Sequence, residues 1–169
     1  MRHAFETSEP LVADTASIAD VAYLVGDVAV GERASVWPFA CLRGDRSPVT
    51  VGDDSNVQEH ATLHGATVGD RVSVGHGAVV DFATVESDCI VGMGAKVLGD
   101  ATVESDCIVA ANAVVRHDQT VPAGHLAYGV PAETRPLTDA QREQITDNWQ
   151  HYTDLGARFA DDGPHHRPD

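Results

Sequence analysis

Residues 83–91 read ATVESDCIV, and residues 101–109 read ATVESDCIV again. An identity of nine residues at an offset of eighteen is an internal repeat, and eighteen divides into three units of six. Branched aliphatic residues recur with this six-residue spacing along most of the chain. These anchor residues are Val12, Ile18, Leu24, Val30, Val36, Leu42, Val51, Val57, Leu63, Val68, Val74, Val80, Val85, Val91, Val97, Val103, Val109, Val115 and Val121.

The residue four places after most anchors is small, as at Ala16, Ala40 and Cys89. Two inward positions in every six, one branched and one small, predict a short strand and a turn. Six residues per face and eighteen per circuit predict a three-sided parallel β-helix over residues 12–125, with coils about 4.8 Å apart. Cys89 should then lie beside Cys107 of the next coil.

The six-residue spacing breaks at three places. Nine residues separate Leu42 from Val51, which predicts a loop that bulges out of the coil. The spacings from Leu63 to Val68 and from Val80 to Val85 are each one residue short. The last two breaks flank the stretch LHGATVGDRVSVGHGAVVD, in which the candidate ligands lie.

The two ends of the chain differ from the repeat. Residues 1–11 are expected to be an N-terminal lead-in, and residues 126–136, rich in Pro and Gly, a connecting loop. Thr138 and Gln141 form a capping-box pattern that predicts a C-terminal α-helix over residues 137–160. Residues 161–169 are expected to be a flexible tail, with His165 and His166 solvated.

The chain carries 26 acidic residues against 11 Lys and Arg, a net charge of −15, which argues against nucleic acid and anionic membranes as partners. The spread of acidic residues is typical of proteins from a cytoplasm with molar salt, although an ordinary acidic protein has the same composition. No apolar run approaches the roughly 20 residues of a membrane span, so we expect a cytoplasmic protein. Three cysteines without CxxC spacing indicate neither a disulfide framework nor a zinc ribbon.

The repeat brings two candidate metal ligands together. His64 and Asp81 each follow an anchor on the same face, one coil apart, so their backbones should lie about 5 Å apart. Imidazole and carboxylate at that distance can share a metal ion. His76 follows an anchor on another face and could join them only across a three-fold interface between parallel copies. The alternative is unrelated surface histidines satisfied by water.

Five motifs carry a resemblance over residues 10–160. They are VWPFACLRGD, NVQEHATLH, VGHGAVVDFATV, GMGAKVL and YGVPAE. In order and spacing the chain resembles the γ-class carbonic anhydrases of the hexapeptide-repeat superfamily. The resemblance implies a left-handed β-helix with a C-terminal α-helix, assembled as a homotrimer with Zn²⁺, or Fe²⁺ or Co²⁺, at each interface, and hydration of CO2 to bicarbonate by a metal-bound hydroxide.

The resemblance also assigns roles to residues. His64 and His76 match two of the family's three metal histidines. Gln58 matches the glutamine that orients the hydroxide, with Asn56 beside it, and Tyr152 is expected either near the site or in packing. The interface and structural residues it implies are Arg43 and Asp45, which form a salt bridge, and Glu59, which stands in place of an aspartate.

Asp81 is a departure, because relatives have histidine at this position. A carboxylate still ligates zinc, but its charge should raise the pKa of metal-bound water, and two histidines with one carboxylate also suit Fe²⁺. His60 is an alternative third ligand. Only Gly-Ala-Thr separates His64 from Val68, so the acidic loop of the prototype enzymes is missing.

Two other functions stay open. The fold could be a trimeric metal-binding scaffold with a degraded site, which would bind metal without hydrating CO2. It could also be a hexapeptide acyltransferase that binds acyl-CoA, in which His60, His117 or His125 would serve as general base.

Overall fold

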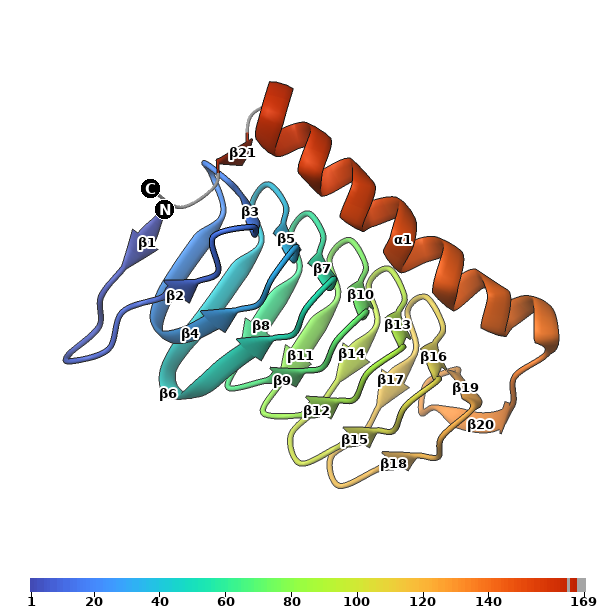
Figure 1. Ribbon diagram of the computed structural model, residues 1–169. Coiled ribbons are helices and arrows are strands. Elements are labelled where there is room, and N and C mark those ends of the chain that lie inside the picture. Colours follow the sequence, from blue (N-terminus) through green and yellow to red (C-terminus); the bar gives the residue numbers. More distant parts are fainter. Residues whose placement is uncertain (164, 167–169) are drawn as a thin grey trace.

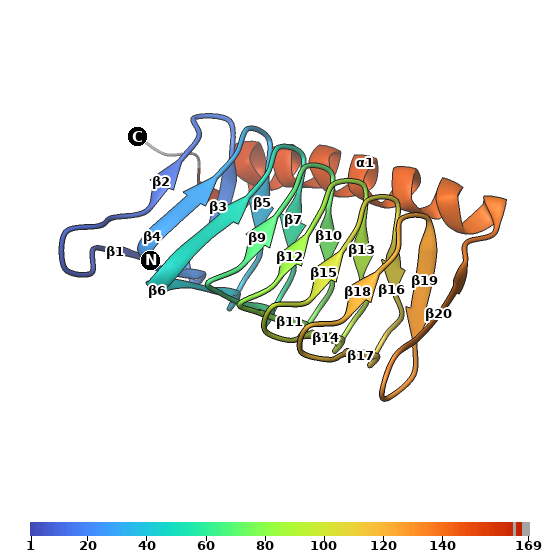
Figure 2. The same cartoon turned by 90° about the horizontal axis from the view of Figure 1, so that it is seen from below.

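The computed structural model describes residues 1–163 and 165–166. Short parallel strands stack into the coils of a left-handed, three-sided β-helix, and one long helix, α1 (Asp139–Asp162), runs back along its side (Figure 1; Figure 2). The fold predicted from the six-residue repeat is confirmed.

Two faces of each coil belong to one bent sheet, which turns its corner within the long strands β4 and β6. The strands of this sheet are β1 (Arg2–His3), β2 (Leu11–Val12), β4 (Tyr23–Val30), β6 (Cys41–Val51), β8 (Thr62–His64), β9 (Thr67–Val68), β11 (Val79–Asp81), β12 (Thr84–Val85), β14 (Lys96–Val97), β15 (Thr102–Val103), β17 (Val114–Val115) and β18 (Thr120–Val121).

The third face lies against α1, and we call it the α1-facing sheet. Its parallel strands are β3 (Ser17–Ala19), β5 (Ser35–Val36), β7 (Asn56–Val57), β10 (Ser73–Val74), β13 (Ile90–Val91), β16 (Ile108–Val109) and β19 (His125–Tyr128). Two antiparallel strands, β20 (Glu133–Pro136) and β21 (His165–His166), flank it at opposite ends.

The core is the stack of anchor and small residues inside the prism. Leu24, Leu42 and Leu63 are fully buried, as are most of the anchor valines. The strand register stacks identical residues of successive coils on one another. For example, Ile90 of β13 pairs with Ile108 of β16. The Cys107 backbone N–H donates to Cys89 Sγ at 3.4 Å, so the predicted stacking of these two cysteines is confirmed.

The predicted loop between Leu42 and Val51 is different in the structure. β6 continues through this segment and pairs with β4, with a register shift between Gly26 and Val28 that leaves the extra residues as a bulge. The backbones approach closely there, since a Cβ at Gly44 would lie 2.0 Å from the Asp27 carbonyl oxygen. Glycine at this position is therefore what lets the long strands pair around the insertion.

The ends of the chain are more regular than expected. The lead-in contains β1, which pairs with β4, and the connecting loop over residues 126–136 contains the β19–β20 hairpin. Helix α1 begins two residues later and ends two residues later than predicted, and the Thr138–Gln141 capping box is present. Within the expected flexible tail, His165–His166 pairs with β3, while residues 164 and 167–169 lie outside the described residues.

Helix α1 covers the α1-facing sheet through an apolar cluster. Ile145 and Leu137 pack on Ile90, Ile108 and Leu126, which point outward from successive coils. Among the residues that the structure describes, no helix has the length and apolar character that a membrane crossing requires.

Candidate metal centre

His64 and Asp81 lie side by side on neighbouring strands. β8 and β11 pair in parallel with Asp81 opposite His64, and His64 Nδ1 is 2.8 Å from Asp81 Oδ1. The His64 ring is buried, whereas the Asp81 side chain is 40% exposed. Asp81 follows His64 by 17 residues, because the spacing from Leu63 to Val68 is one residue short, and the pairing of β8 with β11 brings the imidazole and the carboxylate to one place.

Arg43 and Asp45 of β6 contact the same histidine. Arg43 Nη2 lies 2.9 Å from His64 Nε2, and Asp45 Oδ1 lies 3.2 Å from Arg43 Nε. The contacts of His64 with Asp81 and Arg43 are satisfied together by the tautomer with the proton on Nδ1, because Nε2 then accepts from the guanidinium. The predicted Arg43–Asp45 ion pair therefore forms within one chain, beside the candidate ligands.

His76 lies in the turn between β10 and β11, with Glu59 as its partner. His76 Nδ1 is 2.7 Å from Glu59 Oε2, and the His76 side chain is 43% exposed. A carboxylate that holds one ring nitrogen of a histidine fixes the ring and its tautomer, which leaves the other nitrogen to act as a ligand. Glu59 thus orients His76, a contact that the sequence alone did not predict.

The three predicted ligands do not gather in one chain. Within residues 1–163 and 165–166, no three His, Cys, Asp or Glu side chains are close enough to hold a metal ion. The donor types still fit a metal: two ligand atoms of a tetrahedral zinc lie about 3.4 Å apart, given bonds of 2.0–2.2 Å, and His64 and Asp81 approach to a comparable distance. One chain therefore presents a pair of donors in one place and a single oriented donor, His76, in another.

Gln58 and Asn56 form a buried amide chain on the α1-facing sheet. Gln58 Nε2 donates to Asn56 Oδ1 at 3.0 Å, and Asn56 Nδ2 donates to Ser73 Oγ at 2.8 Å. All three residues are buried. These bonds use the amide N–H of Gln58 and leave its Oε1 as an acceptor.

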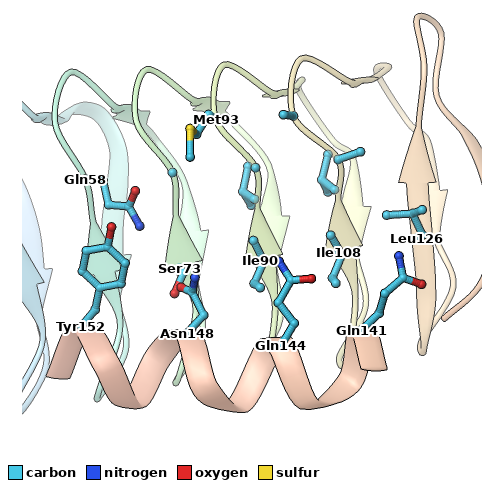
Figure 3. Close-up of a pocket in the computed structure, with 16 residues that line it drawn as sticks. Gln58, Ser73, Ile90, Met93, Ile108, Leu126, Gln141, Gln144, Asn148 and Tyr152 are labelled. Atoms are coloured by element: carbon cyan, nitrogen blue, oxygen red, sulfur yellow. The ribbon is translucent and has the colours of Figure 1, made fainter. Parts of the chain in front are cut away.

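Tyr152 lies opposite Gln58 at one end of a pocket between α1 and the α1-facing sheet (Figure 3). Burial of the hydroxyl raises the pKa of Tyr152 above its usual 10.0, and the negative charge of Glu59 raises it further. The ring also packs edge-on against Trp37 at 5.7 Å between centroids. Tyr152 therefore packs against Trp37 and also lies beside Gln58 in the pocket.

The pocket, of about 390 Å³, contains functional candidates that the sequence did not reveal. Gln141, Gln144 and Asn148 line it from α1 (Figure 3). Their spacing in the sequence could have indicated a shared position, since residues three and four apart lie on one face of a helix.

The histidines of the alternative hypotheses lie elsewhere. The His60 ring stacks on Phe39 with centroids 5.2 Å apart, and His125 Nδ1 contacts the Ala123 carbonyl oxygen at 2.9 Å. His117 is exposed. None of the three lines the pocket.

The coil geometry defines the chain as a hexapeptide-repeat β-helix protein, and residues 82–117 match the family described as bacterial transferase hexapeptide (six repeats). A solved structure of a hexapeptide transferase family protein from Anaplasma phagocytophilum superposes with a TM-score of 0.91 at 30% identity, covering 94% of this chain and 97% of that one. The superposition therefore places nearly the whole chain in this class.

Proteins with similar sequences show to which family within this class the chain belongs. A protein of Methanocaldococcus jannaschii named "Probable carbonic anhydrase" is 42% identical over 86% of this chain and 95% of its own length. The mitochondrial gamma carbonic anhydrase 2 of Arabidopsis thaliana is 34% identical over 86% of this chain, but the match spans only 57% of that longer protein. The chain belongs to the γ-class carbonic anhydrase family.

Proposed function

We propose that this chain is a carbonic anhydrase that hydrates CO2 to bicarbonate at a metal ion held between the subunits of a homotrimer. His64 and Asp81 of one subunit and His76 of the next would hold the ion, which is Zn²⁺, Fe²⁺ or Co²⁺. Such an ion supplies the Lewis acidity that makes water nucleophilic at neutral pH. The family of the chain supports the reaction.

One observation carries the intersubunit arrangement. The chain holds a donor pair, His64 with Asp81, and separately a histidine that Glu59 orients toward solvent. A half-exposed histidine with a dedicated carboxylate partner is arranged for a ligand that its own chain does not complete. A cyclic trimer would join each donor pair to the next subunit's His76.

The polar groups near the site have distinct roles in this proposal. Gln58 accepts a hydrogen bond through Oε1 and so orients the attacking water, while Asn56 holds its amide in place. Tyr152 stays protonated at neutral pH because its pKa is raised, and its hydroxyl can donate to bicarbonate. Arg43 Nη2 lies within 3.2 Å of both ring nitrogens of His64 and would have to move away when an ion binds this histidine, while its ion pair with Asp45 can hold the guanidinium nearby.

Complementation between two inactive variants tests the shared site. His64→Ala and His76→Ala subunits each lack a ligand, and each uniform protein should bind almost no metal. In randomly mixed trimers, about a quarter of the interfaces pair an intact His64 with an intact His76. We expect metal content and CO2 hydration, measured by stopped flow on the same sample, to recover to about that fraction.

The exposed His117 provides the control, because His117→Ala should keep full metal content. A mixed sample with no recovery would contradict a site shared between subunits. Recovery of metal without hydration would instead favour the scaffold alternative.

Asp81→His tests the ligand role of the aspartate. A third imidazole in place of the carboxylate removes one negative charge from the ion's surroundings and should lower the pKa of metal-bound water. We expect the hydration rate per bound metal at neutral pH to rise by about tenfold, the change that a pKa lowered by one unit allows. An unchanged rate at full metal content would show that Asp81 is not a ligand.

A further inference from the structure

The pocket beside α1 is an elongated groove that extends away from Gln58 along the β-helix axis (Figure 3). Its floor is a row of outward side chains from three successive coils, Ile90, Ile108 and Leu126, which the strand register stacks directly above one another. At about 4.8 Å per coil the row extends for about 10 Å. The floor therefore offers a straight apolar track for a short alkyl chain.

The lining of the groove carries no Asp, Glu, Lys, Arg or His side chain, and its one titratable group, the Tyr152 phenol, is neutral at neutral pH because its pKa is raised above 10.0. This absence is informative because 22% of the whole chain is charged and the net charge is −15. An ion in the groove would lose hydration without gaining a partner of opposite charge. The groove therefore selects for uncharged molecules.

The wall opposite the floor carries three side-chain amides from α1, those of Gln141, Gln144 and Asn148. Asn148 Oδ1 is buried and accepts no hydrogen bond from the described residues. Gln141 uses its Oε1 to accept from the Thr138 backbone N–H at 3.1 Å, which leaves its amide N–H groups as donors. Gln144, one helical turn from Asn148 on the same wall, offers further amide N–H donors, so the wall presents an unpaired acceptor with donors one turn away, the complement of a carboxamide.

We propose that this groove binds an uncharged linear molecule with a short alkyl chain and a terminal carboxamide. The alkyl chain lies on Ile90, Ile108 and Leu126, and the carboxamide donates to Asn148 Oδ1 and accepts from a glutamine of α1. The site is separate from the candidate ligands of the metal, so the proposal does not rest on CO2 hydration.

Isoleucine methyl NMR of the full chain in its native assembly, titrated with hexanamide, tests the proposal without any metal. We expect the Ile90 and Ile108 methyl signals to shift with saturation. Three probes of the same length provide the comparison: hexanoate, hexylammonium and 1-hexanol. The two ions should bind at least about tenfold more weakly than the amide, and the alcohol about three- to tenfold more weakly because it offers a single polar group.

Variants of the groove distinguish the contribution of its floor to binding from that of its wall. Ala110→Phe, which fills the groove, should abolish binding of hexanamide and 1-hexanol alike. Asn148→Leu should weaken hexanamide about tenfold and leave 1-hexanol little changed. Asn148→Asp should shift the preference toward hexylammonium, and Gln150→Leu and Gln150→Glu, exposed on α1, are the matched controls.

The stability of each variant is checked by its thermal midpoint, so that unfolding is not mistaken for lost binding. Equal binding of hexanamide and hexanoate, hexanamide binding that survives Ala110→Phe, or the absence of any methyl shift would each overturn the proposal.

Discussion

At the scale of single residues, Glu59 is the group that links the parts of the candidate site. Its carboxylate holds His76 Nδ1 at 2.7 Å, and its charge also raises the pKa of Tyr152. Glu59 Oε2 is buried and makes no hydrogen bond other than this ion-pair contact among the described residues. Replacing this one carboxylate should therefore change both the histidine and the tyrosine.

The titration of Tyr152 gives the first residue-scale prediction. Because its pKa is raised, the folded protein favours the protonated phenol, and this contribution to stability is lost as the pH rises above 10.0. Ultraviolet absorbance at high pH should show a late phenolate component from Tyr152. Tyr152→Phe should remove the late component.

Glu59→Gln should move this late component to lower pH. The pKa of Tyr152 should stay above 10.0, because burial is the larger cause of the shift and remains in the variant. Glu143→Gln, an exposed carboxylate on α1, is the control and should leave the titration unchanged. A late component that is unaffected by Glu59→Gln would show that the two groups do not interact.

At the scale of elements, one apolar cluster holds the first half of α1 to the β-helix, while Tyr152 and Phe159 pack on Trp37 further along the helix. Ile145 is 4% exposed and packs on the outward residues of β13, β16 and β19. Ile145→Ala removes most of a buried side chain and leaves a cavity, so we expect the free energy of unfolding to fall by about 2–4 kcal/mol in urea denaturation. Gln150→Ala on the exposed side of α1 should change it by less than about 0.5 kcal/mol.

Hydrogen exchange locates where the stability is lost. Faster exchange in Ile145→Ala should be confined to α1 and the adjacent hairpin, because the core of the coils does not include Ile145. Equal loss of protection in β8 and β11 would show that α1 and the coils unfold as one unit.

The elements also show what the sequence could predict. The six-residue period predicts the coils, their register and the neighbouring positions of His64 and Asp81, because stacking depends only on spacing. The β19–β20 hairpin was missed, and the insertion between Leu42 and Val51 was predicted as a loop and not as a continuous strand with a bulge, since both lie where the period is interrupted. The contact of Arg43 with His64, that of Glu59 with His76 and the groove under α1 could not be predicted, because they depend on side-chain conformation and on how the helix packs.

At the scale of the whole molecule, the dominant feature is charge. The net charge of −15 is distributed along the chain, and some of the acidic side chains lie where they repel one another. Glu143 and Asp147, for example, are like charges four residues apart on the exposed side of α1, a spacing that destabilises a helix. Pairs such as Arg33 with Asp54 and Arg71 with Asp88 neutralise only a small part of the acidic surface.

Self-repulsion of this kind is weakened by salt, so the stability of the protein should depend on ionic strength. Between 0.1 M and 1 M KCl the Debye length falls from about 10 Å to about 3 Å. We expect the thermal midpoint to rise across this range and to rise most steeply at its lower end, where screening changes fastest. Differential scanning calorimetry at constant pH and protein concentration measures this dependence.

A variant with both Glu143→Gln and Asp147→Asn separates screening from other effects of salt. It reduces the negative charge by two at exposed positions. Its midpoint should therefore be higher than that of the natural chain at 0.1 M KCl and should approach it at 1 M. A midpoint that is constant with salt, or a variant whose gain persists at 1 M, would mean that repulsion does not limit the stability and that the acidic surface is not an adaptation to salt.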